Sequence, residues 1–107
     1  MGYRTYFILV REDGEPFTDD MLQAIEALEV FELVTETMAE GYTKWYTCTD
    51  DMEEFSKLFP GIVFRLHGDG DGDGEENDLW DEYYLDGKSQ RCDAEIIYPP
   101  YDPSKLA

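Results

Sequence analysis

An acidic, glycine-rich stretch, HGDGDGDGEEND at positions 67–78, holds the side chains of this chain that are best suited to bind a cation. It places six carboxylates and four glycines in twelve positions. The opening Asp-x-Asp-x-Asp-Gly, residues 69–74, is typical of an EF-hand calcium loop, in which alternate side chains converge on the ion. The twelfth position of that register requires a bidentate carboxylate, but Trp80 occupies it. A register that starts two residues later puts Glu82 at the twelfth position and Glu76 where a glycine is needed for the turn. The alternative calcium site would therefore use Asp69, Asp71, Asp73 and Glu82, drawn from two incomplete registers.

The same acids also support a second hypothesis, which is mimicry of a nucleic-acid backbone. In an extended chain, alternate residues lie about 6.6 Å apart, from a rise of about 3.3 Å per residue, and this is similar to the spacing of successive phosphates. The residues that this hypothesis assigns to partner binding are the acids Asp69, Asp71, Asp73, Glu75, Glu76, Asp78, Asp81 and Glu82, with Trp80 and Tyr84 as aromatic anchors. The plainer interpretation, a solvated acidic loop, remains open.

Further acids are predicted on two helices, where they would enlarge the acidic surface beyond the loop. They are Asp19, Asp20, Glu26 and Glu29 on the first helix, and Asp50, Asp51, Glu53 and Glu54 on the second.

The overall charge restricts the classes of partner. The chain has 107 residues with a formal net charge of −18, from 26 acidic and 8 basic residues. Such a charge repels nucleic acid and anionic membranes, so the expected partners are cationic or neutral. The chain is expected to bind neither nucleic acid nor a membrane directly, and its oligomeric state is left open.

Few residues are suited to catalysis, so the sequence predicts a protein that is not an enzyme. His67 is the only histidine, and an acid–base role would need an orienting partner and a cleft. The carboxylates between the glycines of the acidic stretch would repel a phosphate group, which argues against a nucleotide loop. Cys48 and Cys92 lie far apart with no Cys-x-x-Cys spacing, so we expect free thiols, no zinc and no cofactor.

Hydrophobic periodicity predicts six strands and two helices. Residues 3–10 are predicted to form a central strand, and Thr18 to cap a helix that ends near Glu29. Residues 30–38 and 42–48 are predicted to form a hairpin with its turn at Gly41. Asp50 with Glu53 indicates the start of a second helix, which Pro60 ends. Strands are then expected over residues 61–66, 79–85 and 88–98, the last two joined by an Asp-Gly turn.

This order predicts an α+β fold. It is the ferredoxin-like split β-α-β plan, β-α-β-β-α-β, in which two helices cover one face of an antiparallel sheet, extended here by a C-terminal β-hairpin. We expect one domain over residues 1–98, with the acidic loop at 68–78, and an extended proline-rich tail over 99–107. Aromatic residues are expected to close the open sheet face or to anchor a protein interface: Trp45, Tyr46, Trp80, Tyr83, Tyr84, Tyr98 and Tyr101.

Two segments, TKWYTCTDDMEEFSKLFPGIVFRLHG and LWDEYYLDGK, resemble the ferredoxin-like domain of the Api92 and YubB proteins of phages, plasmids and other mobile elements. The resemblance covers residues 43–88 and includes Trp45, the Phe59-Pro60 pair and the Asp86-Gly87 turn. It implies the fold and a mobile-element origin, and it assigns no catalytic residue.

These observations together lead to a functional hypothesis. The chain is expected to be a non-enzymatic acidic interaction protein of a phage or mobile element, located in the host cytoplasm. It would inhibit a host defence protein, of the restriction or CRISPR type, by occupying its basic nucleic-acid-binding surface. The alternatives are the calcium-binding domain and an acidic structural module with no specific activity.

Overall fold

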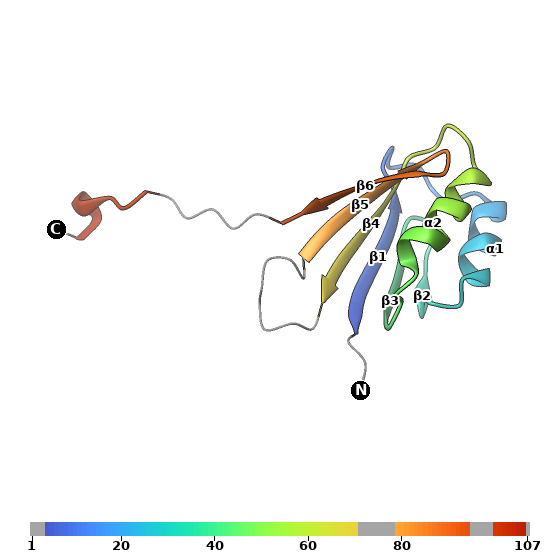
Figure 1. Ribbon diagram of the computed structural model, residues 1–107, viewed down its shortest axis with the longest axis horizontal. Helices are drawn as coiled ribbons and strands as arrows, with labels where there is room; N and C mark the ends of the chain where they lie inside the picture. Colours follow the sequence, from blue (N-terminus) through green and yellow to red (C-terminus); the bar gives the residue numbers. More distant parts are fainter. Residues whose placement is uncertain (1–3, 71–78, 95–99, 107) are drawn as a thin grey trace.

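The computed structural model describes residues 4–70, 79–94 and 100–106. Within these ranges the chain is α+β, with a six-stranded antiparallel sheet and two helices that pack on the same face of it (Figure 1). The elements in chain order are β1 Thr5–Arg11, α1 Asp19–Ala27, β2 Leu33–Val34, β3 Ala39–Thr43, α2 Cys48–Lys57, β4 Phe64–Gly70, β5 Leu79–Leu85, β6 Lys88–Asp93 and the short 3-10 helix η2 Pro103–Leu106.

The strands are ordered β2-β3-β1-β4-β5-β6, and every neighbouring pair is antiparallel. The predicted α+β class is therefore confirmed, and the arrangement is compatible with a ferredoxin-like type of fold. β1 lies at the centre, between β3 and β4. Its predicted central position follows from its composition, because a run of aromatic and branched residues suits a strand with neighbours on both sides.

Alternation along β1 and β4 decides which side chains enter the core. Phe7 and Leu9 of β1, and Phe64 and Leu66 of β4, are buried beneath the helices. They form one hydrophobic cluster with residues of both helices, among them Ile25 of α1. The intervening residues point to the opposite side of the sheet, which we call the open face because none of the described helices covers it (Figure 1).

The predicted start of α1 is confirmed. The Thr18 side chain accepts a hydrogen bond from the backbone N–H of Met21, as an N-cap residue does, and Asp19 and Asp20 occupy the first turn. The predicted start of α2 is wrong by three residues, because Thr47 and not Asp50 is the N-cap residue, the helix begins at Cys48, and Thr47 makes no side-chain cap bond.

A hairpin is predicted for residues 30–38 and 42–48, and β2 and β3 do pair as one, but the predicted turn at Gly41 and the strand limits are wrong. The turn lies at residues 35–38, where the backbone N–H of Thr35 donates to the carbonyl of Met38. Gly41 lies inside β3 and pairs with Phe7 of β1. A Cβ at Gly41 would come within 2.1 Å of the carbonyl oxygen of Val30, so glycine is needed there for close approach and not for a turn.

The Asp86-Gly87 turn is confirmed as a two-residue connection between β5 and β6. Both residues have positive φ, 52° and 85°, as a type I′ turn requires. The turn is attached to the end of α2, because the backbone N–H of Gly87 donates to the Ser56 hydroxyl at 2.8 Å. The Asp86 carboxylate accepts from the N–H of Gly61, also at 2.8 Å. These bonds fix the C-terminal end of α2 against the sheet.

Among the described residues, no helix is long and apolar enough to cross a membrane.

Candidate functional site: an acidic groove between two helices

The two helices carry a strongly one-sided charge on their solvent side, which we call the helical face. Together they hold seven acidic residues and a single basic one, Lys57. The acids are Asp19, Asp20, Glu26, Asp50, Asp51, Glu53 and Glu54. All but Asp51 and Glu53, which are partly buried, are exposed, so the negative potential of this face is directed at solvent.

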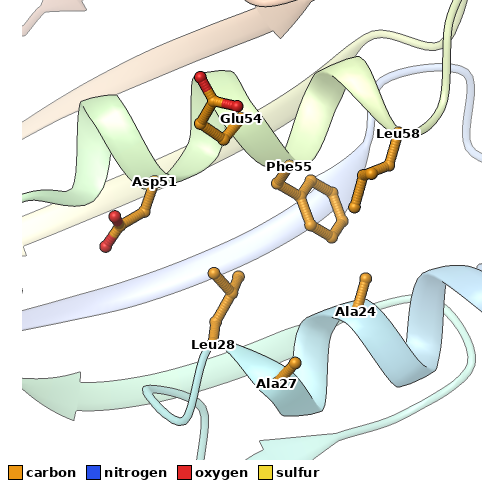
Figure 2. Close-up of a pocket in the computed structure, with 7 residues that line it drawn as sticks. All are labelled: Ala24, Ala27, Leu28, Asp51, Glu54, Phe55 and Leu58. Carbon is orange, nitrogen blue, oxygen red and sulfur yellow. The ribbon is translucent and has the colours of Figure 1, made fainter.

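A groove of about 380 Å³ runs between α1 and α2 within the helical face (Figure 2). Its lining is apolar apart from two carboxylates and consists of Ala24, Ala27, Leu28, Asp51, Glu54, Phe55 and Leu58. Figure 2 shows Leu28 directed toward α2, and Phe55 and Leu58 directed toward α1. Ala24 lies across from Leu58, and Leu28 lies across from the first turns of α2, so the two helices run in opposite directions along the groove.

The apolar residues of the groove differ in how far the core already buries them. Phe55 is 3% exposed and belongs to the core, so it forms the floor. Leu58 is 64% exposed, although it is a large apolar residue at the end of a helix. Single exposed apolar residues are common on protein surfaces, so Leu58 is a candidate contact only because it adjoins the apolar lining of the groove.

Asp51, at one end of the groove, is held in place by two neutral donors. The indole Nε1–H of Trp45 and the hydroxyl of Thr47 both donate to its Oδ2, at 2.7 and 2.8 Å. Glu54 forms an exposed ion pair with Lys57 at 2.9 Å, which reduces the net charge along that side. Asp51 is therefore the carboxylate of the groove that hydrogen bonds hold in position. Trp45 is predicted for the open face, but it is buried on the helix side of the sheet, where it donates to Asp51.

Three of the residues predicted to bind a partner are buried, which corrects that part of the prediction. Trp80 and Tyr84 of β5 are 8% and 0% exposed and lie in the core, and Glu82 is 5% exposed. Alternation along β5 places all three on the helix side of the sheet, where they cannot serve as surface contacts. Of the other aromatic residues, Tyr46 and Tyr101 are exposed, Tyr83 is partly buried on the open face, and Tyr98 lies outside the described residues.

Glu82 is hydrogen-bonded in its buried position by hydroxyl groups. The Tyr84 phenol donates to its Oε1, as does the Thr49 hydroxyl at 2.6 Å. Burial of Tyr84 and its hydrogen bond to Glu82 raise the pKa of the phenol well above its usual value. Burial and the negative charge of Glu82 likewise raise the pKa of the Cys48 thiol, so this cysteine stays protonated and is a poor nucleophile.

The remaining predicted loop residues lie only in part within the described chain. Asp69 is exposed at the end of β4 and points to the open face. Asp81 is partly buried on the same face. The other predicted partner-binding acids, Asp71, Asp73, Glu75, Glu76 and Asp78, lie outside the described residues.

The described part of the alternative calcium set is not brought together. Asp69 points to the open face, whereas Glu82 is buried on the helix side and already accepts two hydrogen bonds. In the described ranges, no three His, Cys, Asp or Glu side chains are grouped so that they could hold a metal ion.

On the open face, His67 lies beside Asp81. Asp81 is therefore the orienting partner that an acid–base role for His67 would require. The Nδ1 of His67 lies 2.7 Å from Oδ1 of Asp81, and the same cross-strand row continues to Cys92. Two hollows of about 250 and 190 Å³ flank the pair. Both are smaller than the roughly 300–1,000 Å³ of typical small-molecule sites, so neither hollow, as the described residues line it, has the size of a substrate cleft. A larger hollow of about 430 Å³ lies beside the β5–β6 turn, but its lining includes Lys88 and no carboxylate.

Searches against models of protein families, curated proteins and solved structures find no match to this chain.

Proposed function

We propose that the chain is a non-enzymatic acidic interaction protein that uses its helical face to occupy the basic nucleic-acid-binding surface of another protein. The observation that carries this proposal is the segregation of charge: seven acids and one lysine on two adjacent helices. Such a field attracts cationic surfaces and raises association rates, and it competes with phosphates for the same lysine and arginine side chains.

The proposal includes a structural assignment and an origin. We infer that β1–α1–β2–β3–α2–β4 forms a ferredoxin-like split β-α-β unit and that β5–β6 is its C-terminal hairpin, which the strand order supports. The segments that resemble Api92 and YubB proteins support a phage or mobile-element origin, with the protein acting in the host cytoplasm. A restriction or CRISPR component that binds DNA or RNA is a suitable target.

Neutralisation of either face of the sheet tests the proposal with matched variants. The helical-face variant carries Asp20→Asn, Glu26→Gln and Asp50→Asn, and the control variant carries Glu12→Gln, Glu40→Gln and Asp69→Asn on the open face. Each variant removes three negative charges, so the total charge is the same. The control variant also breaks the Glu12–Arg65 ion pair, and melting curves verify that it folds.

The experiment captures partners from a bacterial lysate on each immobilised protein and elutes them with duplex DNA. We expect nucleic-acid-binding proteins to be retained by the parent and the control variant and to be released by DNA. Each interfacial charge contributes on the order of 1 kcal/mol, and less at the rim, so the helical-face variant should lose about tenfold or more in affinity for an identified partner. Equal affinity of the two variants, or partners that DNA does not displace, would reject the proposal.

A further inference from the structure

The groove between α1 and α2 combines an apolar floor with a carboxylate boundary, which limits what can fill it. Leu28, Phe55 and the exposed Leu58 offer apolar surface, and the small side chains of Ala24 and Ala27 let an approaching chain come close to the α1 backbone. Apolar surface of this kind favours an aliphatic or aromatic side chain of a partner.

The charge around the groove selects the sign of the partner. Asp51 is positioned at one end by Trp45 and Thr47, and Glu54 lies along α2. Lys57 is the only basic residue on either helix, and it is paired with Glu54. A partner segment with lysine or arginine beside its apolar residues therefore matches both properties of the groove.

The backbone around the groove selects the conformation of the partner. Both walls are helices, which bond their mid-helix N–H and C=O groups internally, so the groove has no strand edge with which an extended chain could pair. A partner helix satisfies its own backbone groups and needs only side-chain contacts. The wall formed by α2 and its C-cap residue runs over the eight residues from Asp51 to Leu58, about 10 Å at a rise of about 1.5 Å per residue, which is close to two turns of a helix.

We propose that this groove binds a cationic amphipathic helix of a partner protein, with its apolar residues over Leu28, Phe55 and Leu58 and its basic residues near Asp51 and Glu54. The proposal rests on the proposed function, because it names the segment through which a basic partner is held. It adds a requirement that charge alone does not impose, which is an apolar stripe at helical spacing on the partner.

Two synthetic 18-residue peptides test this requirement. One places leucine at helical spacing with lysine and arginine on the other positions, and the second has the same composition in a scrambled order without an apolar stripe. Binding to the full chain is measured by calorimetry near 0.15 M salt. We expect the amphipathic peptide to bind at least tenfold more tightly than the scrambled one and to gain helical circular dichroism on binding.

Two leucine variants locate the site. Leu58→Gln removes the exposed leucine of the groove, and Leu33→Gln removes a leucine of β2 that is similarly exposed, 52% against 64%. Neither side chain lies in the core, so both variants should fold, which melting curves verify. We expect Leu58→Gln to weaken the amphipathic peptide about tenfold and Leu33→Gln to leave its affinity unchanged.

The outcomes separate this inference from the proposed function. Equal affinity for the two peptides, or equal effects of the two leucine variants, would overturn the groove assignment while leaving charge-driven binding of basic partners intact. If neither peptide binds and polylysine also fails to bind, the groove assignment and the proposed function both fall.

Discussion

At the scale of single residues, the most unusual group in the described chain is the buried carboxylate of Glu82. A buried acid is costly unless donors surround it, and here the hydroxyls of Tyr84 and Thr49 both donate to it. The sequence placed this residue in an acidic surface cluster because its neighbours Asp78, Asp81 and Asp86 are acidic. The alternation of β5 does contain the correcting signal, since Trp80, Glu82 and Tyr84 fall on one face, and that face includes two large aromatic residues.

Tyr84→Phe tests the hydrogen bond to Glu82. The change removes one of its two hydroxyl donors while it preserves the ring that packs in the core. A hydrogen bond to a charged group contributes about 1.5–3 kcal/mol, so the free energy of unfolding at pH 7 should fall by about that amount. Urea unfolding measures it. Tyr83→Phe, the neighbouring tyrosine on the open face, is the control and should change stability by no more than about 0.5 kcal/mol.

Tyr84→Phe should also differ from the parent in how its stability changes at alkaline pH. The folded pKa of Tyr84 is raised, so above about pH 10 its phenol ionises in the unfolded chain while it stays protonated in the folded one. The folded state then binds more protons, and stability falls as pH rises, by up to about 1.4 kcal/mol per pH unit for this one group. Tyr84→Phe should lose stability less steeply than the parent between pH 10 and 11.5. Identical slopes in the two proteins would contradict the buried phenol.

At the scale of elements, the features that sequence patterns failed to predict are those that depend on contacts between segments far apart in the chain. The strands with strong alternation or a defined turn were predicted well, as β5 Leu79–Leu85 and its Asp86-Gly87 turn illustrate. The error at β2 and β3 came from reading Gly41 as a turn residue, although the residue is small because the chain at Val30 passes close to it. Val30 and Gly41 are separated in the sequence, so no local pattern of residues indicates their contact. The groove between α1 and α2 was missed for the same reason, since it depends on how two helices lie side by side.

Gly41→Ala tests the account of β3. The added Cβ would lie 2.1 Å from the Val30 carbonyl oxygen, so the backbone would have to shift, and we expect a loss of about 3 kcal/mol or more in unfolding free energy. Gly61→Ala serves as the comparison, because it has a positive φ of 77° but nothing within 4 Å of the added atom. It should cost about 1 kcal/mol from backbone strain alone. Similar losses in the two variants, measured by denaturant unfolding, would mean that Gly41 is not sterically constrained.

At the scale of the whole molecule, the net charge of −18 opposes the compact state. The hydrophobic cluster between sheet and helices must offset this repulsion, to which the seven helical acids contribute beside a single lysine. A surface selected only for stability would intersperse charges of both signs. The two helices, with seven acids and one lysine, depart from that pattern, as the proposed binding of a cationic partner requires.

Screening of this repulsion is measurable as salt-dependent stability. Between about 0.01 and 0.15 M NaCl the Debye length falls from about 30 to about 8 Å, so repulsion among the helical acids should weaken and the melting temperature should rise. A gain of about 1 kcal/mol would correspond to about 4–8 °C for a domain of this size.

The variant with Asp20→Asn, Glu26→Gln and Asp50→Asn should melt higher than the parent at low salt and respond less to added NaCl. The open-face variant, with the same total charge, should keep more of the parent's salt dependence, because one of its acids, Glu12, is already paired with Arg65 in the parent. If the two variants respond equally, the repulsion is spread over the whole molecule, and the helical face is not a concentrated acidic surface.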